Sequence, residues 1–525
     1  MKKIYFVILL SISVFFGTLR GFSQVGLQNV KICVISDMHY FDSTLLINDG
    51  FAFQMYLAQD RKLLKESHAI MVSLFDSLIA EHPDIVLIPG DLTKDGENLC
   101  HQKIAAFLLK LKNANIKVFV APGNHDINNP SSFSFDGDTV YSVPTITPSQ
   151  FKTIYNNYGY NVATKTDTAS LSYVAEPISG LQILSMDVCR YDSNYIDMQP
   201  TTSGGFKPNV LKWVKDRLLE AKMNKKVVIA LQHHNLLEHY MGQNDIFPEY
   251  VIDDSDTVSS QLADLGLKVV FTGHYHAQDI IKKTTALGNT IYDVETGSAI
   301  TYPCPYRIMN LSVDTTLAIT GKRVDHIIYN TGSMTFQQYA LNNIQTGLAP
   351  QVIYMLMSPP YNVDSATAYT IEPAITETFI AHFAGNEGTP STQTQAIITM
   401  LQQSPYAFIG YILEGIWDDP DPDDWTVSID LNNSVASGIK ELLNVNTVFL
   451  FPNPSNGIFN VILPEIKNKI AVKVFDINGR MIYNKESFGN RNLLIDISDH
   501  SVGEYIIQLE SNQLKMSKKI MLKQY

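Results

Sequence analysis

Short apolar runs rich in Val and Ile recur along the first two-thirds of this 525-residue chain. Continuous apolar runs of this length are typical of strands buried on both faces, as in parallel sheets covered by helices. Between them, apolar residues recur at helical spacing, so strand and helix alternate and the predicted fold class is α/β. The predicted strands are 30–36, 84–89, 117–121, 181–185, 227–231 and 268–272, and the predicted helices are 63–81, 101–114 and 208–223.

Polar clusters of Asp, His and Asn directly follow five of these runs. In open α/β sheets, ligands bind at the carboxyl ends of the strands, so we expect the clusters to meet in one place. Glycines stand before Asp91, Asn124 and His274, where they allow sharp turns close to a site. The clusters are Asp37-Met-His39, Gly90-Asp91, Gly123-Asn124-His125-Asp126, Gln232-His233-His234-Asn235 and Gly273-His274-Tyr275-His276.

The side chains of these clusters suit divalent metal ions. Carboxylate oxygens and imidazole nitrogens bind first-row metals, Asn124 adds a carbonyl oxygen, and the two oxygens of Asp91 could bridge two ions. Two metals about 3.5–4 Å apart generate a hydroxide nucleophile and clamp the attacking and leaving oxygens of a phosphoryl displacement. A surface turn or cap explains any one cluster alone. All five in this order predict a two-metal centre that hydrolyses phosphate esters.

As a set, from about residue 30 to about residue 324, these motifs resemble the calcineurin-like metallophosphoesterases. The resemblance implies a four-layer α/β/β/α sandwich around two metal ions. It also implies that His125 is the general acid or transition-state donor and Asp126 its orienting partner. By the family's pattern, one metal would take Asp37, His39, Asp91 and His276, and the other would take Asp91, Asn124, His233 and His274.

Several positions keep two interpretations. His233 and His234 are adjacent at a strand end and point to opposite sides; the family's pattern favours His233 as the ligand and leaves His234 behind it or against the substrate. Arg307 could meet a substrate phosphate, although a structural ion pair is the favoured interpretation. No Tyr follows Gly90-Asp91 as in the ferric purple acid phosphatases, so Mn, Zn or ferrous pairs are expected, with the two ions unidentified.

The chain divides into four predicted regions. Residues 1–23 indicate a signal peptide, with a basic start, an apolar stretch and small residues at a possible cut. A membrane anchor is the disfavoured alternative, because a span needs roughly 20 apolar residues. Residues 27–328 hold the phosphoesterase domain. Residues 329–440 are an accessory helical segment with expected helices at 336–345, 376–383 and 392–402, followed by an acidic stretch, 418–424, that is either a linker or an ordered loop.

The last region, 445–525, alternates short apolar runs with turn residues and predicts a small all-β sandwich. Its motifs resemble a C-terminal sorting domain of the type IX secretion system: Phe451-Pro-Asn-Pro-Ser-Asn-Gly457, Val474-Phe-Asp-Ile-Asn-Gly479, Ser501-Val-Gly-Glu-Tyr505 and a basic end. The resemblance implies that the type IX machinery carries the protein across the outer membrane, to the cell surface or the medium. A carbohydrate-binding or adhesive β-module is the alternative.

The net charge of the chain and the predicted site together indicate its partners and its function. The net charge of −13 argues against a nucleic-acid partner, no later run is long enough to span a bilayer, and the pairing of four Cys stays undecided. We expect a secreted or cell-surface hydrolase of small phosphate mono- or diesters. The alternative is a non-enzymatic adhesin or binding protein on the same fold. Segments 41–59, 128–149, 191–206 and 238–249 are the expected walls of the site, with few Lys or Arg.

Overall fold

The computed structural model describes residues 27–194, 198–359 and 361–432, and residues 449–523 with gaps at 452–454, 456, 463–468, 478, 489–491 and 512–514. The predicted signal peptide lies outside the described residues, as do 195–197 of one expected wall and parts of the tail motifs. The chain separates into two compact units, 1–433 and 434–525. Each is described by itself.

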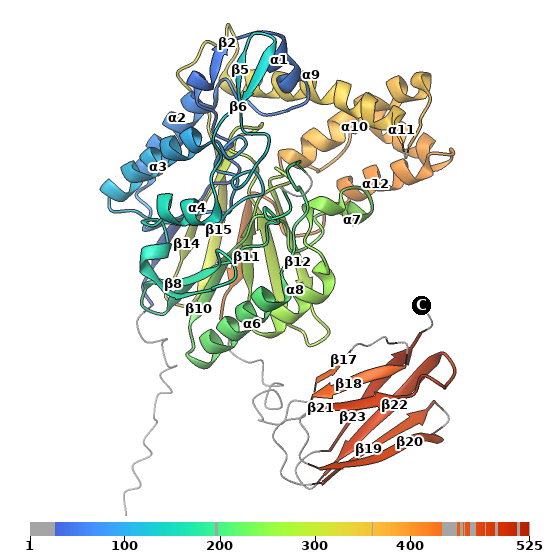
Figure 1. Cartoon of the computed structure of the whole chain (residues 1–525). Helices are drawn as coiled ribbons and strands as arrows, with labels where there is room; N and C mark the ends of the chain where they lie inside the picture. Colours follow the sequence, from blue (N-terminus) through green and yellow to red (C-terminus); the bar gives the residue numbers. More distant parts are fainter. Residues whose placement is uncertain are drawn as a thin grey trace, which may run out of the picture. The chain divides into compact units, whose positions relative to one another are not determined.

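The first unit is built on two large sheets, each of which contains three of the strands predicted from the sequence (Figure 1). In the first sheet, neighbouring strands β1, β3 and β4 run parallel and β14 is antiparallel to β1. Its order is β16 (Thr426–Asp430), β15 (Thr316–Arg323), β14 (Pro305–Leu311), β1 (Val30–Val34), β3 (Ile85–Ile88) and β4 (Lys117–Val120).

The second sheet contains the remaining predicted strands, β9, β10 and β11, which are parallel. On one side β13 is also parallel to β11, and β12 is antiparallel to β13. On the other side β8 is antiparallel to β9, and β7 is antiparallel to β8. Its order is β12 (Asp279–Thr284), β13 (Thr290–Glu295), β11 (Val269–Thr272), β10 (Val227–Leu231), β9 (Leu181–Ser185), β8 (Tyr173–Ile178) and β7 (Ala163–Thr166).

Strand β10 shows why these runs are apolar throughout. Val227, Ile229 and Leu231 lie in the core shared with the first sheet, whereas Val228 and Ala230 face a separate core under α6 and α8. Successive side chains of a strand point to opposite faces, so a strand covered on both sides must be apolar at every position. The helices are α6 (Pro208–Met223) and α8 (Ser255–Asp264) on this side, and α2 (Ser67–Glu81) and α3 (Asn98–Asn113) on the other.

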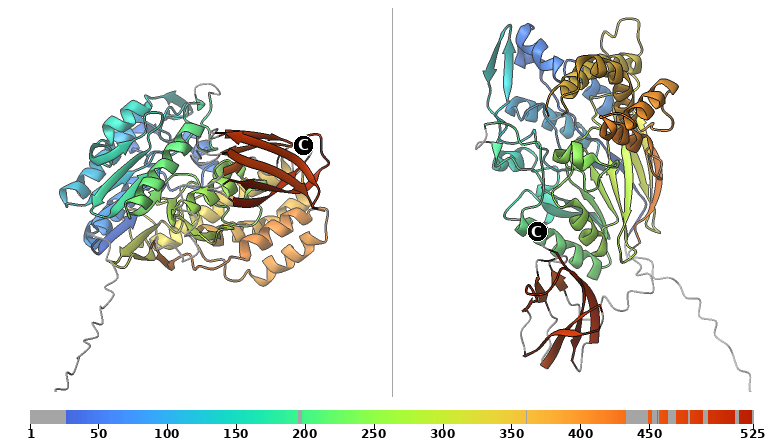
Figure 2. Two further views of the ribbon diagram at one scale, coloured as in Figure 1. Left: turned by 90° about the horizontal axis from the view of Figure 1, so that it is seen from below. Right: turned by 90° about the vertical axis from the view of Figure 1, so that its right-hand side faces the viewer.

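These layers, helix, sheet, sheet and helix, confirm the predicted four-layer α/β/β/α architecture (Figure 2). Several short elements complete the first unit. They are β2 (Leu46–Asn48), β5 (Phe133–Asp136) and β6 (Thr139–Ser142), which form a small sheet, with α1 (Phe51–Ala58), α4 (Pro148–Ile154) and α7 (Gln243–Ile246).

The accessory segment is helical, with its own apolar core. Two of its helices are longer than predicted. Proline usually ends a helix, so the predicted ranges exclude Pro350 and Pro373, whereas the helices continue through both residues. The chain then returns to the first sheet, where β16 pairs with β15. The acidic stretch is an ordered loop, since the buried Asp424 accepts a hydrogen bond from the Ile280 backbone. The helices are α9 (Phe336–Met357), α10 (Ser365–Phe383), α11 (Thr392–Gln402) and α12 (Ala407–Trp417).

The second unit is the expected β-sandwich, with apolar residues of its two sheets packed together. The basic end of the sequence forms an edge strand, β23, which is not among the predicted strands. One sheet is β17 (Phe449–Phe451), β18 (Ile458–Ile462) and β21 (Asn492–Asp496). The other is β20 (Met481–Phe488), β19 (Lys469–Asp476), β22 (Gly503–Glu510) and β23 (Lys515–Leu522).

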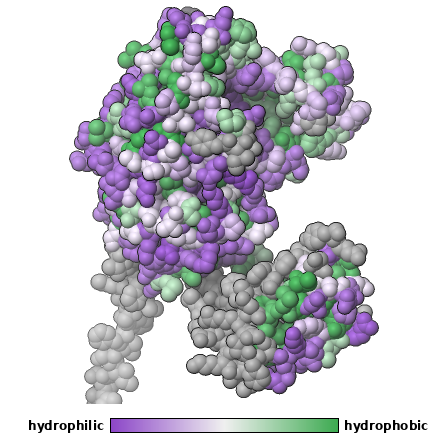
Figure 3. Space-filling model, in the orientation of Figure 1, coloured by the Kyte–Doolittle hydropathy of each residue, from purple (hydrophilic) through white to green (hydrophobic). Residues whose placement is uncertain are grey.

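The described surface of the first unit seen in Figure 3 is mainly hydrophilic with scattered apolar patches. Within the described parts of the chain, none of the helices combines the length and the apolar character needed to cross a bilayer.

Candidate metal centre

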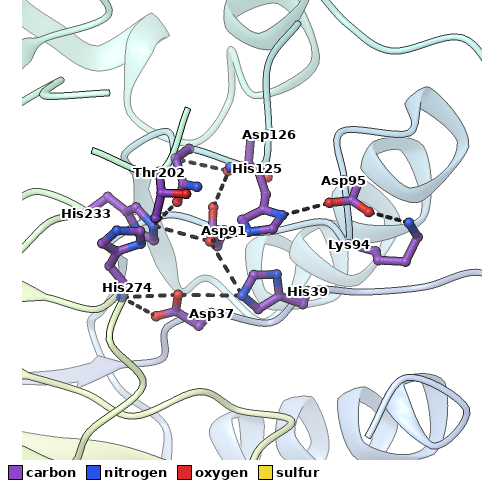
Figure 4. A network of polar contacts seen from close by, with 12 residues as sticks. Asp37, His39, Asp91, Lys94, Asp95, His125, Asp126, Thr202, His233 and His274 are labelled. Carbon is purple, nitrogen blue, oxygen red and sulfur yellow. Dashed lines mark hydrogen bonds and ion pairs between the residues drawn. The ribbon is translucent and has the colours of Figure 1, made fainter. Parts of the chain in front are cut away.

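The predicted ligands come together at the carboxyl ends of β1, β3, β4, β10 and β11 (Figure 4). Five of the seven have a backbone φ in the left-handed region, which non-glycine residues rarely adopt. Such conformations concentrate at functional sites, where the surrounding structure holds them in place. They aim side chains from separate loops at one point. The five residues are Asp37, His39, Asp91, His274 and His276.

The first group of ligands consists of Asp37, His39, Asp91 and His276. The Nε2 atom of His39 lies 3.7 Å from Asp37 Oδ1, 3.4 Å from Asp91 Oδ2 and 3.0 Å from His276 Nε2. His276 Nε2 is 3.4 Å from Asp37 Oδ1. The backbone N–H of His274 donates to both carboxylate oxygens of Asp37 and fixes its orientation. Asp37, His39 and His276 thus form a group that could hold a metal ion, with Asp91 beside His39.

The second group consists of Asp91, Asn124, His233 and His274. His233 Nε2 is 3.2 Å from Asp91 Oδ2 and 2.9 Å from Asn124 Oδ1. Its Nδ1 atom faces the Pro89 carbonyl oxygen at 2.9 Å, so Nδ1–H donates there and Nε2 is free to bind a metal. His274 is arranged the other way, because its Nε2 faces the Glu249 carbonyl oxygen at 3.3 Å and leaves Nδ1 for the site.

The Asp91 carboxylate belongs to both groups. Its Oδ1 accepts a hydrogen bond of 2.9 Å from the His125 backbone N–H. Its Oδ2 is buried without any hydrogen-bond partner, although a buried acceptor without a partner costs roughly 1–3 kcal/mol. Cations held between the two groups would satisfy this oxygen, so the residues present fit two metal ions that share Asp91.

Two glycines let these loops approach closely. A Cβ atom on Gly123 would lie 2.0 Å from Asp91 Oδ1, and one on Gly273 would lie 2.2 Å from Asp37 Oδ2. No side chain can be placed at either position without displacing a ligand. The predicted glycine turns therefore provide space for the ligands.

The charges of the site prepare it for cations. Burial lowers the pKa of His39, His274 and His276, which keeps these imidazoles neutral, as metal ligands must be. Burial alone would raise the pKa of Asp91, but its histidine neighbours outweigh burial and lower it. Burial would likewise lower the pKa of His233, yet the charge of Asp91 raises it to about 9, so a metal ion that binds Nε2 would displace a proton from this imidazole.

His125 lies beside the two groups and keeps 24% of its side chain exposed. Its Nδ1 atom is 2.8 Å from Asp95 Oδ1, and its Nε2 atom is 4.0 Å from Asp91 Oδ2. Burial lowers the pKa of His125, but the charge of Asp91 and the hydrogen bond to Asp95 outweigh it and raise the pKa. The imidazole therefore tends to hold a second proton on Nε2, which points toward the site.

The expectation that Asp126 orients His125 is wrong, because Asp95 makes that contact. Asp126 instead accepts hydrogen bonds from the backbone N–H groups of Leu92, Thr93 and Gly123. It thereby ties the loop after β3 to the loop after β4. Asp95 is held in turn by an ion pair with the buried Lys94 and by the Tyr56 hydroxyl at 2.8 Å.

Comparison with known protein families identifies the domain that contains these residues. The family model described as calcineurin-like phosphoesterase matches residues 30–278, which include all seven ligand candidates and His125. Residues 30–278 form a calcineurin-like phosphoesterase domain. A second model, the secretion system C-terminal sorting domain, matches residues 449–523.

Solved structures resemble this chain only distantly. A dimetal phosphatase from Danio rerio is 14% identical, over 56% of this chain and 95% of its own, with a TM-score of 0.39. A purple acid phosphatase from yellow lupin (Lupinus luteus) seeds is 11% identical, over 57% of this chain and 52% of its own, with a TM-score of 0.37. No curated protein matches the chain.

Two further candidate site residues, His234 and Arg307, do not line the cavity at the metal-binding groups. His234 is fully buried, its ring lies 4.2 Å from the ring of His274, and its Nε2 atom faces the Thr202 carbonyl oxygen at 2.7 Å. Arg307 is also fully buried and donates to backbone carbonyl oxygens, among them that of Asp424 at 2.6 Å. The substrate-binding roles considered for both residues are therefore corrected to structural ones.

A cavity of about 200 Å³ opens onto the metal-binding groups. Gln59 and Thr202 come from two of the expected wall segments. Arg61 and Lys62 also line it, so the expectation of a wall poor in basic residues is wrong at this point. Gln351 comes from α9 of the accessory segment. The sequence prediction missed Arg61 and Lys62. The only feature that could have indicated them is their position, two adjacent basic residues just beyond the expected wall segment 41–59.

The four cysteines left undecided by the sequence, Cys33, Cys100, Cys189 and Cys304, are all buried free thiols in this structure. Burial raises the pKa of the Cys33 thiol to about 12, which makes it a poor nucleophile.

Proposed function

We propose that the protein is an exported two-metal phosphoesterase that hydrolyses a small phosphate mono- or diester. The observation that carries the proposal is the buried Asp91 Oδ2, which has no hydrogen-bond partner and lies between the two histidine groups of a phosphoesterase domain. Asp37, His39 and His276 would hold one ion and Asn124, His233 and His274 the other, with Asp91 shared. Two divalent ions supply Lewis acidity toward the phosphate and acidify the attacking water.

The protein's own residues would handle the leaving group. His125 is partly exposed, lines the cavity, and has its Nδ1–H directed to Asp95. This leaves the Nε2 proton directed at the cavity, where it can pass to the departing alkoxide as the ester bond breaks. The Asp95 carboxylate stabilises the protonated imidazole before the transfer. Lys62, also on the cavity wall, adds positive charge where a phosphate would lie.

Export is the second part of the proposal. The matched sorting domain supports handling by the type IX secretion machinery, and the first residues of the sequence supply the predicted signal peptide. A non-enzymatic role on the same fold would predict at least one ligand position filled by an unsuitable residue. Every position carries a metal-binding side chain, so we do not favour it.

The test replaces the shared ligand. Asp91→Asn keeps the size of the side chain and removes its charge; we expect loss of at least one bound metal per chain and turnover slower by about two orders of magnitude or more. Metal content is measured by elemental analysis, and activity with 4-nitrophenyl phosphate and bis(4-nitrophenyl) phosphate in the presence of Mn²⁺. Asp325→Asn, at an exposed carboxylate outside the site, is the matched control. Unchanged metal content and activity in Asp91→Asn would refute the proposal.

A further inference from the structure

A second cavity lies next to the one that opens onto the metal centre. It also measures about 200 Å³, but its walls are mainly apolar and aromatic. Arg61, Tyr250 and Gln351 line both cavities, so the two spaces meet at these residues. The apolar walls come from α9, α10 and the segment around Phe247, and include Tyr275, Leu348, Val352, Met355, Phe379 and Phe383.

The apolar space continues between the accessory helices. A smaller cavity of about 30 Å³ shares Phe247, Met355 and Phe379 with the second one, and every residue around it is apolar or aromatic. The three spaces thus change from polar at the metal centre to wholly apolar inside the helical segment. A ligand pocket of this kind, mostly apolar with a few polar groups at one end, is the usual form of a small-molecule site.

Arg61 lies at the point where polar and apolar walls meet. Its guanidinium group is 4.5 Å from the centre of the Phe383 ring, and its Nη2 donates to the Tyr275 carbonyl oxygen at 3.0 Å. Its Nε atom is buried without a hydrogen-bond partner. The guanidinium group thus places positive charge at the border between the polar and the apolar walls, which suits an oxygen of a bound ester.

We infer that the substrate carries an apolar organic group, alkyl or aromatic, which the accessory helices bind while its phosphate lies at the metal centre. This inference rests on the proposed function and adds the class of ester to it. The apolar cavity borders the reaction space at Arg61, Tyr250 and Gln351, and water would find few polar partners on its walls. The apolar part of the substrate is therefore its occupant. Arg61 and Gln351 become the residues that contact the ester linkage.

The experiment compares esters that differ only in their apolar group. One series consists of 4-nitrophenyl phosphodiesters with a methyl, ethyl or butyl second ester, followed by nitrophenol release. The other consists of methyl, ethyl and butyl phosphate, followed by phosphate release. Burial of one methylene favours binding about fourfold. We therefore expect kcat/KM to rise about tenfold or more from methyl to butyl in at least one series.

A filled cavity should remove this preference. Met355 is partly buried and lines both apolar spaces, so Met355→Trp should reduce the butyl-to-methyl ratio of kcat/KM to about two or less. The matched control is Tyr354→Trp, which introduces the same side chain on the same helix at a position that is 76% exposed. It should retain the wild-type ratio. Thermal unfolding of both variants shows whether the fold is kept.

The outcomes separate the two proposals. If the metal-loaded wild type hydrolyses none of these esters, the proposed function itself fails. If it hydrolyses them but the ratio stays within about twofold, or Met355→Trp keeps the wild-type ratio, the two-metal chemistry stands and the apolar substrate class is overturned. If Met355→Trp does not fold, Leu348→Phe, at another wall of the same cavity, provides the same comparison.

Discussion

At the scale of single residues, two carboxylates close in sequence to the metal ligands have different tasks. Asp95 contacts the His125 imidazole, whereas Asp126 contacts backbone N–H groups of two ligand-bearing loops. In the proposed mechanism the first contact would act on the proton that His125 passes to the leaving group. The second acts on the positions of Asp91 and Asn124. Substitutions at the two sites should therefore produce different defects.

We expect Asp95→Asn to slow turnover by about one to two orders of magnitude while the protein retains its metal, because contacts that orient a catalytic imidazole are worth this much. KM should change little, since Asp95 does not line the cavity. Steady-state kinetics and metal analysis check this. Asp126→Asn is the comparison and should lose metal as well. Equal metal loss in both variants would contradict the assignment of Asp95.

The sequence predicted which candidate ligands the fold brings together, but not the residues that support them. Each ligand lies within a few residues of a buried strand, so the periodicity that reveals the strand also locates the ligand. Asp95 follows Lys94 in a polar loop, where an acid–base pair has the appearance of a solvated turn. Only the fold shows that Lys94 is fully buried among aromatic rings, and that Asp95 faces His125.

At the scale of elements, a buried carboxyl group joins the loop after the accessory helices to the core. Asp424, in the loop before β16, donates a hydrogen bond to Asp279 of β12. Nearby, the buried His382 at the end of α10 pairs with Glu387 at 2.6 Å. Burial and then the charge of Asp279 raise the pKa of Asp424 to about 11. The carboxyl group is therefore protonated in the folded protein at neutral pH.

This contact predicts how stability depends on pH. In the unfolded chain the pKa of an Asp is about 3.9, so the folded protein binds the extra proton between about pH 4 and pH 11. The stabilisation is complete below pH 4 and declines as the pH rises, so the melting temperature should fall from pH 5 to pH 9. Asp424→Asn keeps a donor toward Asp279 and should flatten this slope in thermal unfolding at constant ionic strength. Asp418→Asn, exposed in the same loop, is the control, and parallel curves for all three proteins would contradict the assignment.

At the scale of the whole molecule, the two units are built independently. All the proposed catalytic residues and three of the four apolar clusters lie in the first unit. The second unit has its own sandwich core. The last strand of the first unit, β16, ends at Asp430 and buries Ile429 against the sheet. The residues that line the described cavity at the candidate metal centre all precede β16 in the sequence.

A protein comprising residues 27–432 should therefore keep kcat/KM and metal content within about twofold of the full-length protein. A protein ending at Trp425 lacks β16, so it exposes the edge of β15 and loses the buried Ile429 and Leu431. We expect that shorter form to aggregate or to unfold at a lower temperature. Kinetics and thermal unfolding compare the two. A loss of activity in the longer form would show that the tail takes part in catalysis.

The pairing of β15 with β16 has one more consequence. The chain leaves the first sheet at Arg323 and re-enters it at Thr426, which pairs with Thr320. The helices between these points are an insertion whose two ends meet on neighbouring strands, and such insertions are tolerated because their ends need little rearrangement. Selection could exchange this cassette for another without touching a metal ligand. If the proposed function and substrate class hold, the chemistry of the site and its choice of ester could then evolve separately.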